Sequence, residues 1–213
     1  RWTIEDGDSV IFFNFRGDRA IEISRAFTEE NFNKFDRVRV PKVYYAGMLQ
    51  YDSELKIPEH FLTAPPNITN TLTEQLIKYN INEYAVSETQ KYGHVTYFWN
   101  GNKIDKFSDT LETYERVDSD IIPFDQAPAM KAYEITDKFI NAIKTNKYQF
   151  LRCNFPNGDM VGHTGNYDAT VKSMEAVDEN IGRIMQACDE TNTILLVIAD
   201  HGNAETMVDE KGN

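Results

Sequence analysis

Residues 194–199 read Ile-Leu-Leu-Val-Ile-Ala and are followed at once by Asp200, His201 and Gly202. A short, continuous, β-branched apolar run is typical of a buried strand in a parallel sheet. In an open α/β sheet, ligands gather beyond the carboxyl ends of the strands. The glycine lets the chain turn away there without a Cβ clash. We therefore expect Asp200 and His201 to lie at the functional edge of such a sheet.

The segment before this run predicts the rest of a strand–helix–strand unit. Residues 148–155 read as a strand that leads directly into Asn157, Gly158 and Asp159. Residues 168–188 predict a long helix, because apolar side chains recur there near helical spacing. Such a unit implies parallel pairing and a right-handed crossover. The predicted fold class is therefore α/β, with a mostly parallel sheet and flanking helices.

The first part of the chain predicts a second, smaller α/β domain. Residues 8–14 and 42–49 read as strands, with a helix between them. Residues 57–67 contain three prolines and predict no regular element, so we place a domain boundary there. Residues 1–65 then belong to the smaller domain and residues 66–213 to the larger one.

The larger domain is predicted to contain further elements before the first aspartate. Residues 83–86 and 94–99 read as strands, and Asn100–Gly101 is a two-residue hairpin signal. Residues 127–144 predict a helix with one apolar side.

Composition excludes several classes of protein. The formal net charge of -12 over 213 residues argues against nucleic acid as a partner, because binding a nucleic-acid phosphate backbone needs an excess of Lys and Arg. The sequence has neither an apolar run long enough for a membrane span nor a signal-peptide pattern. Cys153 and Cys188 lie in apolar segments, which favours reduced thiols and a cytoplasmic protein. The chain starts at Arg1 and stops at Asn213, and we read it as a fragment.

Two aspartate–histidine pairs are candidate metal ligands. Asp159 and His163 are four residues apart, so a helical turn would place both on one face. Carboxylate and neutral imidazole suit Mn²⁺ or Zn²⁺. Two aspartates 4 Å apart would repel by about 4 kcal/mol at an effective dielectric of 20, and a divalent cation removes that conflict. The alternative is that Asp200 and His201 only open a loop. Four ligands are also too few for two ions.

Four ordered motifs resemble a known family. The chain is similar to the cofactor-independent phosphoglycerate mutases of the alkaline phosphatase superfamily. The matching stretches are residues 13–20 (FNFRGDRA), 91–99 (KYGHVTYFW), 157–165 (NGDMVGHTG) and 199–205 (ADHGNAE). This resemblance implies an alkaline-phosphatase-like fold. It also implies that the chain is a C-terminal portion of a two-domain enzyme.

The resemblance implies a reaction and its cofactors. The family interconverts 3-phosphoglycerate and 2-phosphoglycerate in glycolysis and gluconeogenesis, through a phosphoserine intermediate. Its substrate is a small phosphorylated three-carbon acid. It uses two divalent metal ions, Mn²⁺ foremost, with Mg²⁺, Co²⁺ or Zn²⁺ as alternatives. Residues 1–65 would be the C-terminal part of the inserted substrate-binding domain, and residues 66–213 part of the metal-binding domain.

Carried over by position, the resemblance assigns roles to seven residues. Arg16 and Arg19 would bind the substrate, since the planar guanidinium matches phosphate or carboxylate oxygens. Lys91 would be catalytic, placing positive charge at the transferring phosphoryl group. One metal ion would be held by Asp159 and His163, and the other by Asp200 and His201.

The chain also departs from the family pattern. It contains no Gly-Asn-Ser-Glu-Val-Gly-His motif, which carries the family's nucleophilic serine. Gln90 stands before Lys91, where many bacterial members have glutamate. We therefore expect the chain to be inactive alone and to need the missing N-terminal part as a partner. Two other functions stay open: a metal-dependent phosphohydrolase of the same superfamily, and a non-catalytic truncated chain.

Overall fold

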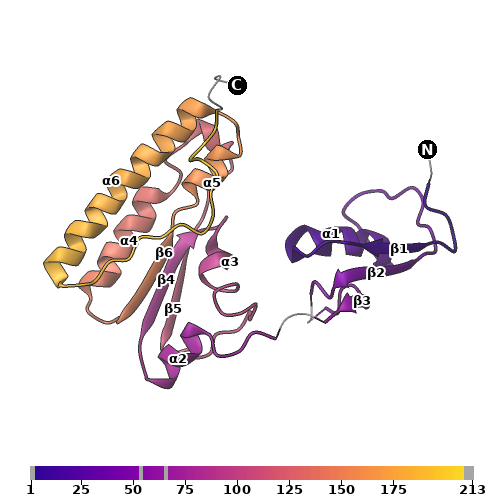
Figure 1. Ribbon diagram of the computed structural model, residues 1–213, viewed down its shortest axis with the longest axis horizontal. Coiled ribbons are helices and arrows are strands. Elements are labelled where there is room, and N and C mark those ends of the chain that lie inside the picture. The colour runs from indigo at the N-terminus through magenta and orange to yellow at the C-terminus, as the bar shows by residue number, and fades with distance from the viewer. Residues whose placement is uncertain (1–2, 53–54, 65–66, 209–213) are drawn as a thin grey trace. The chain divides into compact units, whose positions relative to one another are not determined.

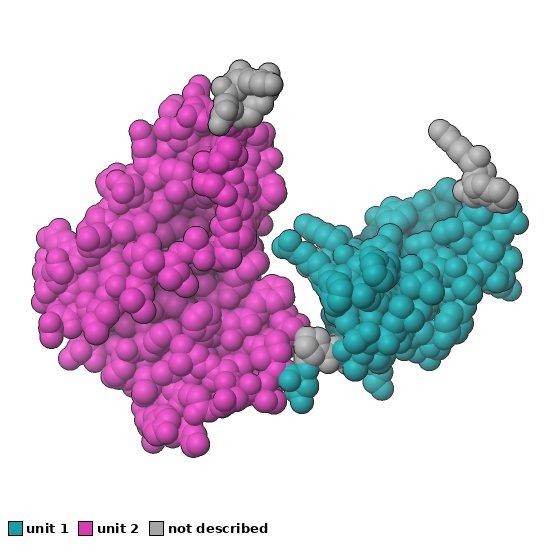
Figure 2. All heavy atoms as spheres, in the orientation of Figure 1, with its two compact units in different colours: residues 1–67 teal, residues 68–213 magenta. Residues whose placement is uncertain are grey.

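A computed structural model describes residues 3–52, 55–64 and 67–208 of the chain (Figure 1). Two features used in the predictions lie outside the described residues. They are the two chain ends, Arg1 and Asn213, and two prolines of the predicted boundary, Pro65 and Pro66. The chain divides into two compact units, Arg1–Asn67 and Ile68–Asn213 (Figure 2).

The first unit contains a small parallel sheet and one helix. Its elements are β1 (Ser9–Phe12), α1 (Gly17–Thr28), β2 (Tyr44–Leu49) and β3 (His60–Thr63), and the strand order is β1-β2-β3. The strand β3 corrects the prediction that residues 57–67 hold no regular element, because Pro58 precedes this strand and does not interrupt its pairing.

The second unit is built on a three-stranded parallel sheet. The strand order is β5-β4-β6, formed by Glu112–Val117, Glu83–Glu88 and Phe150–Asn154. All six residues of β4 are buried, as expected for the central strand of a covered sheet. The strand β5 was not predicted from the sequence, because its charged residues do not form an apolar pattern.

Helices cover both faces of this sheet. On one face α4 (Ala132–Lys144) packs on β4 and β6, and α6 (Tyr167–Thr191) packs on α4 (Figure 1). The other face carries the short α3 (Tyr92–Val95). The remaining helices are α2 (Leu72–Lys78), a 3-10 turn η1 (Phe124–Gln126) and α5 (Asn157–Gly162). The predicted α/β class with a parallel sheet and flanking helices is confirmed.

Alternation along β6 separates an apolar core from a buried ion pair. Leu151 and Cys153 join the cluster of apolar side chains between the sheet and α4. Arg152 points the other way and donates to the α3 carbonyl of Val95 at 2.8 Å. Its Nη1 and Nη2 reach Glu83 Oε2 and Oε1 at 2.9 and 3.1 Å, so a fully buried carboxylate has its cation.

The strand predicted at residues 94–99 is wrong, and so is the hairpin at Asn100–Gly101. The chain there forms α3 and a run of turns. Thr96 Oγ1 donates to the Tyr92 carbonyl at 2.8 Å, and the Asn100 amide donates to the Thr96 carbonyl at 2.9 Å. Val95 is buried against the sheet. Local hydrogen bonds and this burial therefore outweigh the β-propensity of the aromatic and β-branched side chains.

Residues 194–199 are also not a strand. Ile194, Leu196 and Ile198 are 88%, 83% and 86% exposed, and only Leu195 packs against the core. A strand requires a neighbour with which to form its ladder. Within the described residues, β6 pairs only with β4, and nothing pairs with residues 194–199. The predicted strand–helix–strand unit is consequently left without its second strand.

Candidate metal centre

The carboxyl edge of the second sheet positions most of the candidate residues. Lys91 follows β4, and Asp159 lies in α5, directly after β6. Because β4 and β6 are parallel neighbours, their carboxyl ends share one edge. The segment with Asp200 and His201 reaches the same place, although it does not arrive there as a strand.

The Lys91 ammonium lies where these groups converge. Its Nζ is 2.6 Å from Asp159 Oδ2, 3.5 Å from Asp200 Oδ2 and 3.0 Å from His201 Nε2. The lysine side chain is only 5% exposed. A buried ammonium between two carboxylates neutralises charges that would otherwise repel each other. The two aspartates therefore already share one positive charge.

Asp159 is the hub of the site. Its Oδ1 lies 3.1 Å from His163 Nε2, and its Oδ2 lies 3.6 Å from His201 Nε2. The predicted helical turn is present, since Asp159 lies in α5 and His163 directly follows it. Burial opposes ionisation of the Asp159 carboxyl. Hydrogen bonds from Lys91 and Asn203, with nearby positive charge, outweigh burial and lower the pKa of Asp159 below its ordinary value.

Sequence reasoning missed Asn203 as part of the site. Its Nδ2 donates to both the backbone carbonyl and Oδ1 of Asp159, each at 3.1 Å. The residue lies in one of the motifs that carry the family resemblance, but an amide after a turn has many ordinary uses. Only its contact with a residue 44 positions away marks it.

Glu88 is a fully buried carboxyl near this edge. It is the last residue of β4 and is 2% exposed. Burial raises the pKa of Glu88 above its ordinary value, although the Lys131 backbone N–H, which donates to its Oε2 at 3.1 Å, favours the ionised form.

The donor set fits a divalent cation in chemistry but is incomplete in number. Carboxylate oxygens and imidazole nitrogens are the ligands that Mn²⁺, Co²⁺ and Zn²⁺ accept. The Lys91 ammonium, bound to Asp159 and Asp200, indicates that the site favours positive charge. Across the described ranges, however, no group of three or more His, Cys, Asp and Glu side chains is arranged to hold an ion. Full coordination would need further ligands or a rearrangement.

Arg16 and Arg19 lie in the first unit. Arg16 precedes α1 and Arg19 is in its first turn. The Arg19 side chain is 82% exposed, and its Nη1 is 2.8 Å from Glu22 Oε1. Both arginines lie at the N-terminal end of α1, so their side chains could recognise one anion together. Their substrate-binding role stays a prediction.

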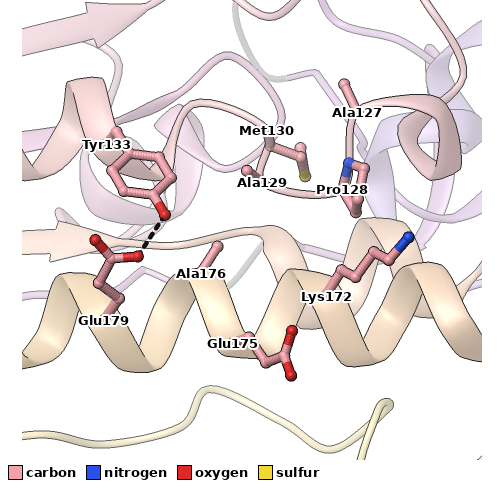
Figure 3. Close-up of a pocket in the computed structure, with 9 residues that line it drawn as sticks. All are labelled: Ala127, Pro128, Ala129, Met130, Tyr133, Lys172, Glu175, Ala176 and Glu179. Carbon is pink, nitrogen blue, oxygen red and sulfur yellow. Dashed lines mark hydrogen bonds between the residues drawn. The ribbon is translucent and has the colours of Figure 1, made fainter.

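A pocket of about 370 Å³ lies elsewhere in the second unit (Figure 3). It is lined by residues 127–130 and by side chains of α4 and α6, among them Tyr133, Lys172 and Glu179. Tyr133 donates to Glu179 at 2.6 Å across it. None of the predicted site residues lines this pocket.

In the described part of the chain, no helix has both the length and the apolar character that crossing a bilayer requires.

Comparison with known proteins defines the class. A sequence profile of the metalloenzyme superfamily matches residues 14–211. The chain belongs to the metalloenzyme superfamily.

Individual relatives are similar over nearly all of this chain. A probable 2,3-bisphosphoglycerate-independent phosphoglycerate mutase of Leptospira interrogans is 59% identical over 99% of the chain. The corresponding mutase of Trypanosoma brucei brucei is 57% identical over 99%. A crystal structure of Leishmania mexicana phosphoglycerate mutase at low cobalt concentration matches with a TM-score of 0.82 and 52% identity, again over 99% of the chain. The chain spans 38–39% of the length of these relatives.

Proposed function

We propose that this chain is part of a phosphoglycerate mutase that interconverts 3-phosphoglycerate and 2-phosphoglycerate in glycolysis and gluconeogenesis. One observation carries the proposal: the Lys91 ammonium, Asp159 and Asp200 meet at the carboxyl edge of a parallel sheet. The similar proteins named as phosphoglycerate mutases support it.

The metal-binding part of the proposal concerns four side chains. Asp159 with His163 would hold one divalent ion, and Asp200 with His201 the other. Mn²⁺ is our first choice, and Mg²⁺, Co²⁺ or Zn²⁺ would also accept these ligands. When bound, the ions supply charge stabilisation for the transferring phosphoryl group and activation of the nucleophile. The remaining ligands and the serine nucleophile would come from other parts of the polypeptide, so the 213-residue chain alone should be inactive.

Lys91 would act on the substrate directly. Its ammonium is held in a buried position by Asp159, Asp200 and His201, where water screens electrostatic interactions little, although the two carboxylates offset part of its charge. Presented to the oxygens of the phosphoryl group, it would offset their negative charge as the phosphoryl group moves between hydroxyls.

Arg16 and Arg19 would hold the substrate from the first unit. Two guanidinium groups spaced three residues apart at a helix start can grip one carboxylate or phosphate through parallel hydrogen bonds. They would keep the glycerate in place while it turns between the two phosphoryl transfers. On this proposal Arg1–Asn67 is part of the substrate-binding domain and Ile68–Asn213 is part of the metal-binding domain.

A phosphorus NMR assay tests the proposal. The intact polypeptide with Mn²⁺ should convert 3-phosphoglycerate to a mixture with 2-phosphoglycerate without releasing phosphate. Lys91→Ala should lower kcat by about 100-fold or more. Lys144→Ala removes an exposed lysine from the same unit and should leave the rate unchanged. Phosphate release would identify a metal-dependent phosphohydrolase. If neither 2-phosphoglycerate nor free phosphate forms, the chain is non-catalytic.

We place the protein in the cytoplasm. Cys153 and Cys188 are both free thiols, in keeping with a reducing compartment. The net charge of -12 makes a nucleic-acid partner unfavourable.

A further inference from the structure

Asn203 joins two separate parts of the candidate metal centre. Its Nδ2 lies 3.1 Å from both the backbone oxygen and Oδ1 of Asp159. A primary amide has two hydrogens, so one nitrogen can donate to both acceptors at once. Bonds to the backbone and the carboxylate of the same residue fix the side-chain torsions of Asp159.

Gly162 provides the space that this amide occupies. A Cβ atom at position 162 would lie 3.0 Å from Asn203 Oδ1 and 3.2 Å from its Cγ. Gly162 is in α5, where glycine is less favourable than alanine. A methyl group there would require the Asn203 side chain to shift by a few tenths of an ångström. The glycine therefore leaves room for the amide where it bonds Asp159.

The other contacts of Asp159 do not fix its orientation in the same way. Lys91 reaches Oδ2 from a long, flexible side chain, and His163 approaches Oδ1 with a 72% exposed ring. Asn203 is short and partly buried, and of these three side chains it is the one that bonds both the backbone carbonyl and the carboxylate of Asp159. Its backbone continues the turn that carries Asp200 and His201, so the same two bonds anchor that turn to α5.

We propose that Asn203 is a positioning residue of the metal centre, which orients the Asp159 carboxylate and anchors the Asp200–His201 turn, with Gly162 keeping room for its amide. The inference rests on the proposed function, because it assumes that Asp159 is a metal ligand. Groups that orient a metal ligand from outside typically change metal affinity by about 10- to 100-fold when they are removed.

Calorimetric Mn²⁺ titration of the intact polypeptide tests this role. Asn203→Ala and Gly162→Ala should each weaken Mn²⁺ binding by about 10- to 100-fold. Asn203→Asp is the decisive variant, because it adds negative charge but cannot donate to Asp159. Electrostatics alone would make this variant bind Mn²⁺ more tightly, whereas positioning makes it bind more weakly. Asn141→Ala, at an exposed site on α4, is the matched control and should bind as the wild type does.

A second readout does not depend on metal or on the variants folding. In the metal-free wild-type polypeptide, the Asn203 side-chain amide protons should exchange with water more slowly than those of Asn141. Equal exchange rates for the two side chains would overturn the inference. It would also be overturned if Asn203→Ala and Gly162→Ala bound Mn²⁺ within twofold of the wild type, or if Asn203→Asp bound Mn²⁺ more tightly than the wild type. Failure of the wild type itself to bind Mn²⁺ would instead contradict the proposed function on which the inference rests.

Discussion

Replacing Lys91 by methionine removes the positive charge that Asp159 and Asp200 share. The ammonium is 2.6 Å from Asp159 Oδ2, which corresponds to an attraction of roughly 6 kcal/mol at an effective dielectric of 20. Desolvation of the lysine cancels part of that attraction. Breaking a buried pair by removing one partner costs about 3–5 kcal/mol. Because the Asp159 and Asp200 side chains keep 16% and 44% exposure, we expect the low end, about 3 kcal/mol.

The assay is urea unfolding followed by far-ultraviolet circular dichroism, with a chelator present so that no metal replaces the lost charge. Lys144→Met is the control. Lys144 Nζ is 3.1 Å from Glu190, but both side chains are about half exposed, so its loss should cost less than about 1 kcal/mol. A Lys91→Met variant no less stable than this control would refute the reasoning.

The pH dependence of this loss has a definite sign. The pKa of Asp159 in the folded protein is below its ordinary value. Its contribution to stability is therefore fully present above the unfolded pKa of about 3.9 and is lost as the pH falls through the folded pKa. The cost of Lys91→Met should be largest near neutral pH and should shrink as the pH falls, because protonation of Asp159 removes the uncompensated carboxylate from the variant. A cost that stays constant from about pH 7 to pH 3 would contradict the assigned role of Asp159.

Three further predictions concern the second unit. Arg152→Met leaves the fully buried Glu83 without a cation, so urea unfolding should show a loss of about 3–5 kcal/mol in the free energy of unfolding. Adding Glu83→Gln should recover much of this loss, and no recovery would contradict the assigned ion pair. The pKa of Glu88 is raised, so its ionisation destabilises the fold as the pH rises above about 4.3. Glu88→Gln should therefore be more stable relative to wild type at pH 7 than at pH 4, and a constant difference in unfolding free energy would refute this. Leu195→Ala should cost about 1–2 kcal/mol and Leu196→Ala less than about 0.5, because only Leu195 packs on the core; equal losses in thermal unfolding would contradict the assigned burial.

Local sequence patterns predicted much of the site because its residues follow short-range rules. The four-residue spacing of Asp159 and His163 predicted one helical turn, and α5 provides it. The strand at residues 148–155 and the long helix after it are present as β6 and α6. Both are strongly patterned elements with an apolar side that packs in the core.

The errors arise where structure depends on distant partners. Residues 194–199 have the composition of a buried strand, yet strand formation needs a neighbouring ladder that the described residues do not provide. The reverse holds for β5, which pairs with β4 despite its charged residues. Glu112 and Tyr114 of β5 are accommodated in a polar network with Asn100. Likewise, no local pattern shows that the Asn203 amide bonds Asp159.

Anomalous X-ray diffraction at the manganese edge, on crystals of the intact polypeptide grown with Mn²⁺, tests the central claim most directly. We predict one manganese bonded to Asp159 and His163 and a second bonded to Asp200 and His201, with the Lys91 ammonium beside them. Manganese bound elsewhere, or no anomalous signal at these four side chains, would contradict the account.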